Sequence, residues 1–137
     1  MKICVTASGN TLDASVDPRF GRAAYLTIVD SESMAFEAIP NAAAGAIGGA
    51  GIQAAQSLAK KGAEVLITGN VGPNAFRALS AAGIKIATGA SGTVKDVVER
   101  YKRGELSRTD EPTVNGHFGK GMGRGNSQGL NDLSRRV

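Results

Sequence analysis

Cysteine, histidine and aromatic residues are scarce in this chain, and each shortage excludes a class of site. The 137 residues include one cysteine, Cys4, one histidine, His117, two Tyr, four Phe and no Trp. A single cysteine permits neither an intrachain disulfide nor a multi-cysteine metal site, and it fits a reducing cytoplasm, which is the expected location. Without an aromatic platform for stacked bases, we expect no nucleic-acid partner.

Long apolar runs and clustered carboxylates are also missing. The apolar run near the amino terminus is too short for a signal peptide. No segment approaches the ~20 apolar residues of a membrane span, so no membrane partner is expected. The first predicted strand carries no carboxylate for a two-metal nuclease, and His117 has no serine and aspartate arranged around it. Cys4 is better explained as a buried core thiol than as a nucleophile. The sequence therefore predicts no enzymatic activity.

The apolar pattern that is present predicts one α/β domain over residues 1–104. Three strands come first, and two later strands alternate with three helices, which favours right-handed crossovers and a mixed sheet of about five strands. Thr93 and Asp96 have the spacing of a capping box at the start of the third helix. In the first helix, five residues are expected near one face: Ile52, Ala55, Gln56, Leu58 and Ala59. The expected strands are 2–8, 25–30, 34–39, 64–68 and 84–88, and the expected helices are 49–61, 73–82 and 93–103.

The remaining residues, 105–137, have a different composition. They are rich in glycine and lack hydrophobic periodicity, and we expect them to form mostly a flexible tail. The net charge of +4 is mild, and it favours a small anionic ligand over a long polyanion.

Glycine-rich loops follow three predicted strands, and a glycine stretch precedes the first helix. The carboxyl ends of strands and the amino ends of helices are where α/β sheets bind ligands, and exposed backbone amides suit an anion. Gly49–Ala54 matches GxGxxA, but no acidic residue ends the next strand, so a dinucleotide site is not expected. The alternative is that each glycine only forms a turn or a cap. The candidate anion-binding residues in these loops are Ser8, Gly9, Gly48, Gly49, Gly69, Asn70, Gly72, Gly89 and Ser91.

Residues 16–30, VDPRFGRAAYLTIVD, resemble the dinitrogenase iron-molybdenum cofactor biosynthesis family, together with MKICVTA at the start and ITGNVGPNAF further on. That family includes nitrogenase cofactor carriers of the NifX type, the carboxy-terminal domain of NifB and the molybdenum-copper orange protein. The resemblance covers about residues 1–104. It implies a three-layer, ribonuclease H-like fold, in the order β-β-β-α-β-α-β-α and without nuclease activity.

The same resemblance implies a carrier of an anionic metal-sulfur cluster of the Fe/Mo or Mo/Cu type. Such a cluster brings its own sulfide and is not covalently held by cysteines. Arg19 and Arg22 would bind it, or would instead only pin their loop to the sheet. His117 is the candidate metal ligand, with an ordinary polar role as the alternative, and the Met122 thioether is a weaker candidate. Cofactor-assembly proteins are the implied partners, and the chain is expected to be a monomer or homodimer.

Two other functions are compatible with the sequence. A regulatory module could bind a small phosphorylated metabolite in the same pocket. A protein-interaction domain could have a shallow pocket and dock its partner through residues 105–137.

Overall fold

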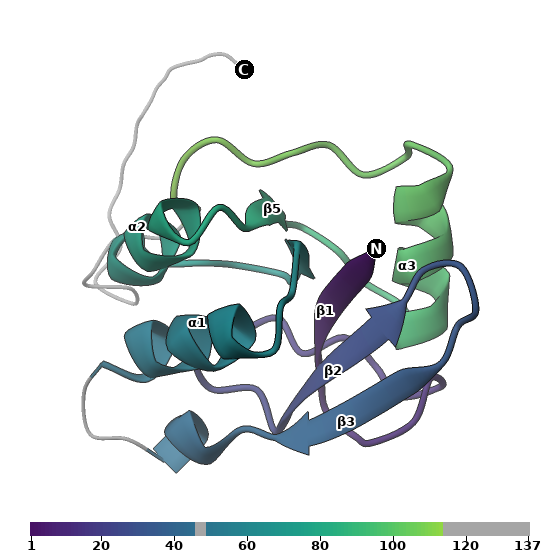
Figure 1. Ribbon diagram of the computed structural model, residues 1–137, viewed down its shortest axis with the longest axis horizontal. Coiled ribbons are helices and arrows are strands. Elements are labelled where there is room, and N and C mark those ends of the chain that lie inside the picture. Colours follow the sequence, from purple (N-terminus) through teal and green to yellow (C-terminus); the bar gives the residue numbers. More distant parts are fainter. Residues whose placement is uncertain (46–48, 114–137) are drawn as a thin grey trace.

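A five-stranded mixed sheet forms the centre of the protein. The structure, a computed structural model, describes residues 1–45 and 49–113. The strand order is β3-β2-β1-β4-β5, in which β1 pairs antiparallel with β2 and parallel with β4 (Figure 1). The strands are β1 (Lys2–Ala7), β2 (Tyr25–Asp30), β3 (Phe36–Pro40), β4 (Val65–Ile67) and β5 (Lys85–Ala87), and the helices are α1 (Ala50–Lys60), α2 (Pro73–Ala81) and α3 (Val94–Lys102), with a short 3₁₀ helix, η1 (Ala42–Gly45), before α1.

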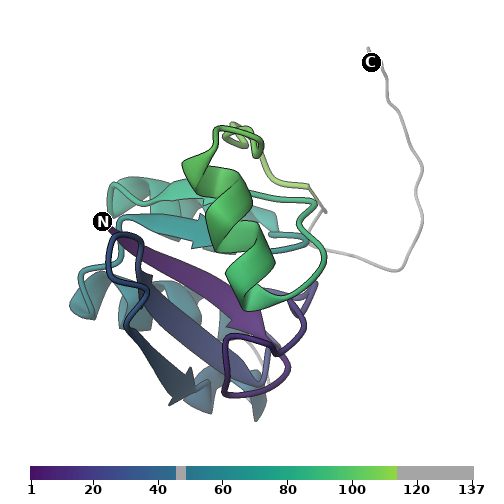
Figure 2. The same cartoon turned by 90° about the vertical axis from the view of Figure 1, so that its right-hand side faces the viewer.

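Helices cover both faces of the sheet, which gives three layers (Figures 1 and 2). Side chains alternate along β1, so that Ile3 and Val5 pack on the α3 side while Cys4 packs on the side of α1 and α2. Each face therefore has its own apolar core, in which strand residues pack against α1 and α2 on one face and against α3 on the other. The predicted element order, mixed sheet and fold class are confirmed.

The face expected for α1 is confirmed at Ala55 and Leu58 and is wrong at Ile52, Gln56 and Ala59, which are exposed. The buried residues of the helix are Ala50, Ala54, Ala55 and Leu58, whereas Ile52 is 37% exposed. Buried positions four residues apart lie on one side of a helix, and Ile52 is two positions from Ala54, on the opposite side. This places the Ile52 side chain outside the core.

The first residues of the predicted tail contact the domain. Leu106 packs against the core on the α3 side, and the Thr109 amide donates to Ile86 O at 2.6 Å. Thr113 pairs with Val71, whose amide donates to the Thr113 hydroxyl at 2.8 Å. In the described ranges, no helix is long and apolar enough to cross a membrane.

Candidate functional site

The segment of residues 17–22, called here the arginine loop, crosses the carboxyl ends of β1 and β4. The Asp17 amide donates to Thr6 O at 2.8 Å, and the Thr6 hydroxyl donates to Asp17 O at 2.7 Å. The Asn70 amide donates to Pro18 O at 2.8 Å. Strands β1 and β4 are parallel neighbours, so these bonds fix the loop over the edge where both strands end.

Three glycines let the arginine loop and the helices approach closely. A Cβ on Gly69 would lie 2.6 Å from Pro18 Cα, and a Cβ on Gly21 would lie 2.8 Å from the backbone nitrogen of Gly51. A Cβ on Gly51 would itself lie 2.8 Å from the Ala75 Cβ, at the contact between α1 and α2. These glycines serve backbone packing. Gly69, a predicted ligand residue, lies beneath the arginine loop.

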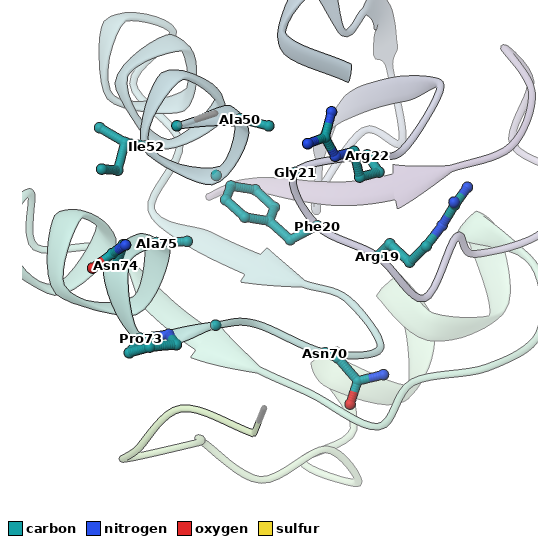
Figure 3. A pocket seen from close by; sticks show the side chains of 13 residues that line it. Arg19, Phe20, Gly21, Arg22, Ala50, Ile52, Asn70, Pro73, Asn74 and Ala75 are labelled. Carbon is teal, nitrogen blue, oxygen red and sulfur yellow. The ribbon is translucent and has the colours of Figure 1, made fainter. Parts of the chain in front are cut away.

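A cavity of ≈ 520 Å³ opens between the arginine loop and the amino ends of α1 and α2 (Figure 3). Its volume is within the range of small-molecule sites. Among the described lining residues, two are arginines and none carries a carboxylate. The lining consists of Arg19, Phe20, Gly21, Arg22, Gly49, Ala50, Gly51, Ile52, Asn70, Gly72, Pro73, Asn74 and Ala75.

Two helices begin at this cavity with open amino ends. Gly49 caps α1 and Gly72 caps α2, and in the described part of the chain no side chain makes a capping hydrogen bond to either helix. The first turns of both helices contain no acidic residue. The first amides of a helix have no intrahelical acceptor, and the helix dipole adds partial positive charge there. The cavity therefore offers backbone donors from two helices to an anion.

Both arginines of the loop make contacts within the protein. The Arg19 side chain is 64% exposed, and its Nε lies 3.4 Å from Asp17 Oδ1, which also accepts the Arg19 amide at 2.9 Å. The Arg22 Nη1 donates to Ala44 O at 2.8 Å, which ties the loop to η1. In Figure 3 the two guanidinium groups lie on the side of the cavity opposite Ile52 and Asn74. Both charges are thus positioned at the cavity before any ligand binds.

Asn41 joins the arginine loop to the glycine-rich stretch. Its buried side-chain amide donates to Gly21 O at 3.2 Å and Ala23 O at 3.0 Å, and its oxygen accepts from the Ala43 amide at 3.2 Å. The sequence pattern does not single out Asn41 as a site residue. An asparagine just before a helical turn is a typical capping signal, and it predicts the bond to Ala43 but not those to the loop.

The amino end of α3 is closed by the protein itself. Thr93 and Asp96 form the predicted capping box, with 3.1 Å from the Asp96 amide to Thr93 Oγ1 and 3.3 Å from the Thr93 amide to Asp96 Oδ2. The amides of Val94 and Lys95 donate to carbonyls in the loop of residues 8–16, both at 3.0 Å. This end therefore has an internal partner for each of its first amides.

Apart from Gly69, which lies beneath the arginine loop, the predicted ligand residues fall into three groups by position. Arg19, Arg22, Gly49, Asn70 and Gly72 line the cavity together. Ser8, Gly9, Gly89 and Ser91 lie outside the lining, in loops near the closed end of α3, where for example the Ser8 amide donates to Ser15 O at 2.9 Å. Gly48, His117 and Met122 lie outside the described residues.

The described residues provide no direct set of metal ligands. They include no group of three or more His, Cys, Asp or Glu side chains that could hold a metal ion. Cys4 is completely buried in β1, and this burial raises the pKa of its thiol. Because the thiolate is the metal-binding form, Cys4 does not supply a ligand to the cavity.

Two solved structures of similar sequence share this architecture, and a further protein is similar in sequence. The apo form of the orange protein from Desulfovibrio gigas is 50% identical, with a TM-score of 0.80 over 82% of this chain and 95% of that one. A Thermotoga protein whose structure carries the provisional name of a NifB protein of the DUF35 family is 39% identical, with a TM-score of 0.69 over 78% of this chain and 91% of that one. An uncharacterized protein of Methanocaldococcus jannaschii is 27% identical over 111 residues, 79% of this chain and 91% of its own.

A family model agrees with these similarities and with the resemblance carried by the RFGRA segment. The model described as dinitrogenase iron-molybdenum cofactor matches residues 1–104, which include the sheet, all three helices and the arginine loop. The chain therefore belongs to the dinitrogenase iron-molybdenum cofactor family.

Proposed function

We propose that this protein binds and carries an anionic metal-sulfur cluster in the cavity between the arginine loop and the amino ends of α1 and α2. The observation that carries the proposal is the combination of two open helix ends with Arg19 and Arg22 around a lining whose described residues include no carboxylate. Both charged side chains of the lining and both helix dipoles favour an anion. The role is binding and transfer of the cluster rather than catalysis.

The size and chemistry of the lining favour a bulky sulfide-rich anion over a single phosphate. Phe20, Ile52 and Pro73 contribute apolar surface beside the backbone amides. Sulfide is a soft, polarizable ligand that tolerates apolar contact better than phosphate oxygen does. Because Cys4 is buried on a strand, the cluster keeps its own sulfide ligands and is held without protein thiolates.

Two classes of cargo are proposed, and the family description supports the iron-molybdenum class. Iron-molybdenum cofactor precursors and Mo/Cu sulfide clusters both carry negative charge and terminal or bridging sulfide. Cofactor-assembly proteins are the partners that would deliver or receive such a cargo. His117, which lies outside the described residues, remains a candidate ligand for a metal at the surface of the bound cluster.

The test is anaerobic reconstitution of the full chain with tetrathiomolybdate and Cu(I), followed by desalting, a visible spectrum and metal analysis. We expect a retained chromophore. Arg19→Ala should weaken retention by about twofold to fivefold, because an exposed charge contributes modestly. Arg103→Ala is a matched control: Arg103 is 56% exposed and pairs with Glu105, two residues away, as Arg19 pairs with Asp17.

Three outcomes separate the candidate functions. Retention that falls with Arg19→Ala but not with Arg103→Ala supports cluster carriage in this cavity. Failure to retain any chromophore, with iron-sulfur precursors as well, contradicts it. Stabilisation by inorganic phosphate in place of cluster retention would favour the module that binds a phosphorylated metabolite.

A further inference from the structure

Asp17 carries a buried carboxylate beside the cavity, and the proposed anion site does not include it. Its side chain is 9% exposed, and Asp17 is not among the described residues that line the cavity. Backbone and side-chain hydrogen bonds with Thr6, at 2.8 and 2.7 Å, fix the Asp17 backbone at the end of β1. Its Oδ1 accepts the Arg19 amide at 2.9 Å. The fold therefore holds a negative charge next to one of the two arginines of the cavity.

The guanidinium of Arg19 is bound to this carboxylate only loosely. Its Nε lies 3.4 Å from Asp17 Oδ1, and its Nη2 lies 3.5 Å from Asp17 Oδ2. Strong hydrogen bonds between arginine and carboxylate are shorter, at about 2.7–2.9 Å. The Arg19 side chain is also 64% exposed, and in Figure 3 it points away from Phe20 and Ala75. The pair therefore combines a fixed carboxylate with an arginine side chain that can change its partner.

We propose that the Asp17 carboxylate competes with the bound anion for the Arg19 guanidinium and thereby lowers the affinity of the cavity. This inference rests on the proposed function. When an anion enters the cavity, Arg19 turns toward it and leaves Asp17, so the loss of one attraction offsets part of the gain of the other. When the anion leaves, Asp17 takes the guanidinium back. A competing carboxylate thus favours release, which a carrier needs as much as it needs binding.

The experiment compares Asp17→Asn with the unmodified full chain, with tetrathiomolybdate alone as the anionic probe. Asparagine has nearly the same shape and keeps an oxygen that accepts the Arg19 amide, but it carries no charge. The probe should bind about twofold to fivefold more tightly, mainly through slower dissociation. The gain should shrink at high salt, which screens exposed charges. The matched control is Asp13→Asn, which removes the same charge from an exposed loop position and should leave the affinity unchanged.

Two further measurements test whether Asp17 acts through Arg19. In a chain that already carries Arg19→Gln, Asp17→Asn should give no gain in affinity, because the residue for which it competes is gone. In the unmodified chain, the NMR signal of the Arg19 Nε–H group should shift when the probe saturates the cavity. The Nε–H signal of Arg103, which donates to Glu105 at 2.8 Å, should stay in place. This second measurement needs no variant and does not depend on the folding of Asp17→Asn.

The outcomes distinguish this inference from the proposed function. An affinity of Asp17→Asn that is unchanged, reduced or matched by Asp13→Asn would show that the carboxylate only shapes the loop. A gain that persists with Arg19→Gln, or an Arg19 Nε–H signal that the probe does not shift, would also overturn the competition. All of these results leave the cavity as an anion site. If the unmodified chain does not bind the probe, the proposed function and this inference fail together.

Discussion

The three helices begin in two different ways. At α3, Thr93 and Asp96 satisfy one another, and the carbonyls of the preceding loop accept the next amides. At α1 and α2, glycine caps leave the first amides facing a cavity, without a side-chain cap among the described residues. An open helix end forgoes the stabilisation of a cap. Two adjacent open ends that face two arginines across one cavity are the feature on which the proposed anion site rests.

The largest loss of anion affinity and of stability is expected from a substitution that blocks the open amino end of α1. In Gly21→Ala the new Cβ would lie 2.8 Å from the Gly51 nitrogen. The arginine loop must move away from α1, and we expect the free energy of unfolding to fall by about 1–3 kcal/mol. Anion affinity should fall by about tenfold or more, because amide donors are covered or displaced. Urea unfolding and tetrathiomolybdate titration measure the two effects.

Gly9→Ala is the matched control at the closed side. Its Cβ would lie 3.2 Å from the Ala14 methyl group, which can shift slightly. The anion affinity should be unchanged. Equal losses of affinity in Gly9→Ala and Gly21→Ala would contradict the distinction between the two regions.

Removing the cap at the closed end should affect stability alone. Thr93→Ala deletes the hydroxyl that accepts the Asp96 amide at 3.1 Å, which should lower the free energy of unfolding by about 1 kcal/mol. Thr93→Ser keeps a hydroxyl and should recover most of that loss. A reduced anion affinity in folded Thr93→Ala would mean that α3 also contributes to the site.

Adding a carboxylate to an open end should change stability and affinity in opposite directions. Asn74 is the second residue of α2, and its side-chain oxygen accepts from Arg77 Nη2. Asn74→Asp keeps that acceptor and places negative charge at the helix amino end, which should stabilise the fold by about 0.3–1 kcal/mol. Anion binding should weaken. Asn10→Asp, which adds the same charge at an exposed loop position, serves as the control for net charge.

The smallest effect is expected at Asp30, whose carboxylate accepts backbone amides in the turn after β2. Asp30 accepts the amides of Glu32 at 2.9 Å and Ser33 at 3.3 Å, which lowers the pKa of its carboxyl group. The stabilisation is present above the pKa of the unfolded chain, about 3.9, and is lost as the pH falls through the lower native value. In Asp30→Asn the free energy of unfolding should vary less with pH below about pH 5 than it does in the unmodified chain. An unchanged slope would contradict the assignment.

The sequence predicts local features of this protein better than contacts between distant segments. The strands and the Thr93 capping box follow from spacing and residue type, which act over a few residues. The contact of Gly21 with Gly51 joins positions 30 residues apart (51 − 21), and no local pattern encodes it. The sequence predicts that the glycine loops converge at the carboxyl ends of the strands. It does not predict which helix ends are capped, because the capping carbonyls and side chains come from other segments of the chain.

The most direct test is a two-dimensional amide NMR titration of the full chain with tetrathiomolybdate. If the open helix ends bind the anion, the amides of Gly51, Ile52, Asn74 and Ala75 should show the largest shifts at the helix amino ends. Those of Val94, Lys95 and Asp96, already bonded within the protein, should barely move. Shifts concentrated at α3, or none at α1 and α2 while the anion binds, would contradict the assignment of this cavity as the anion site.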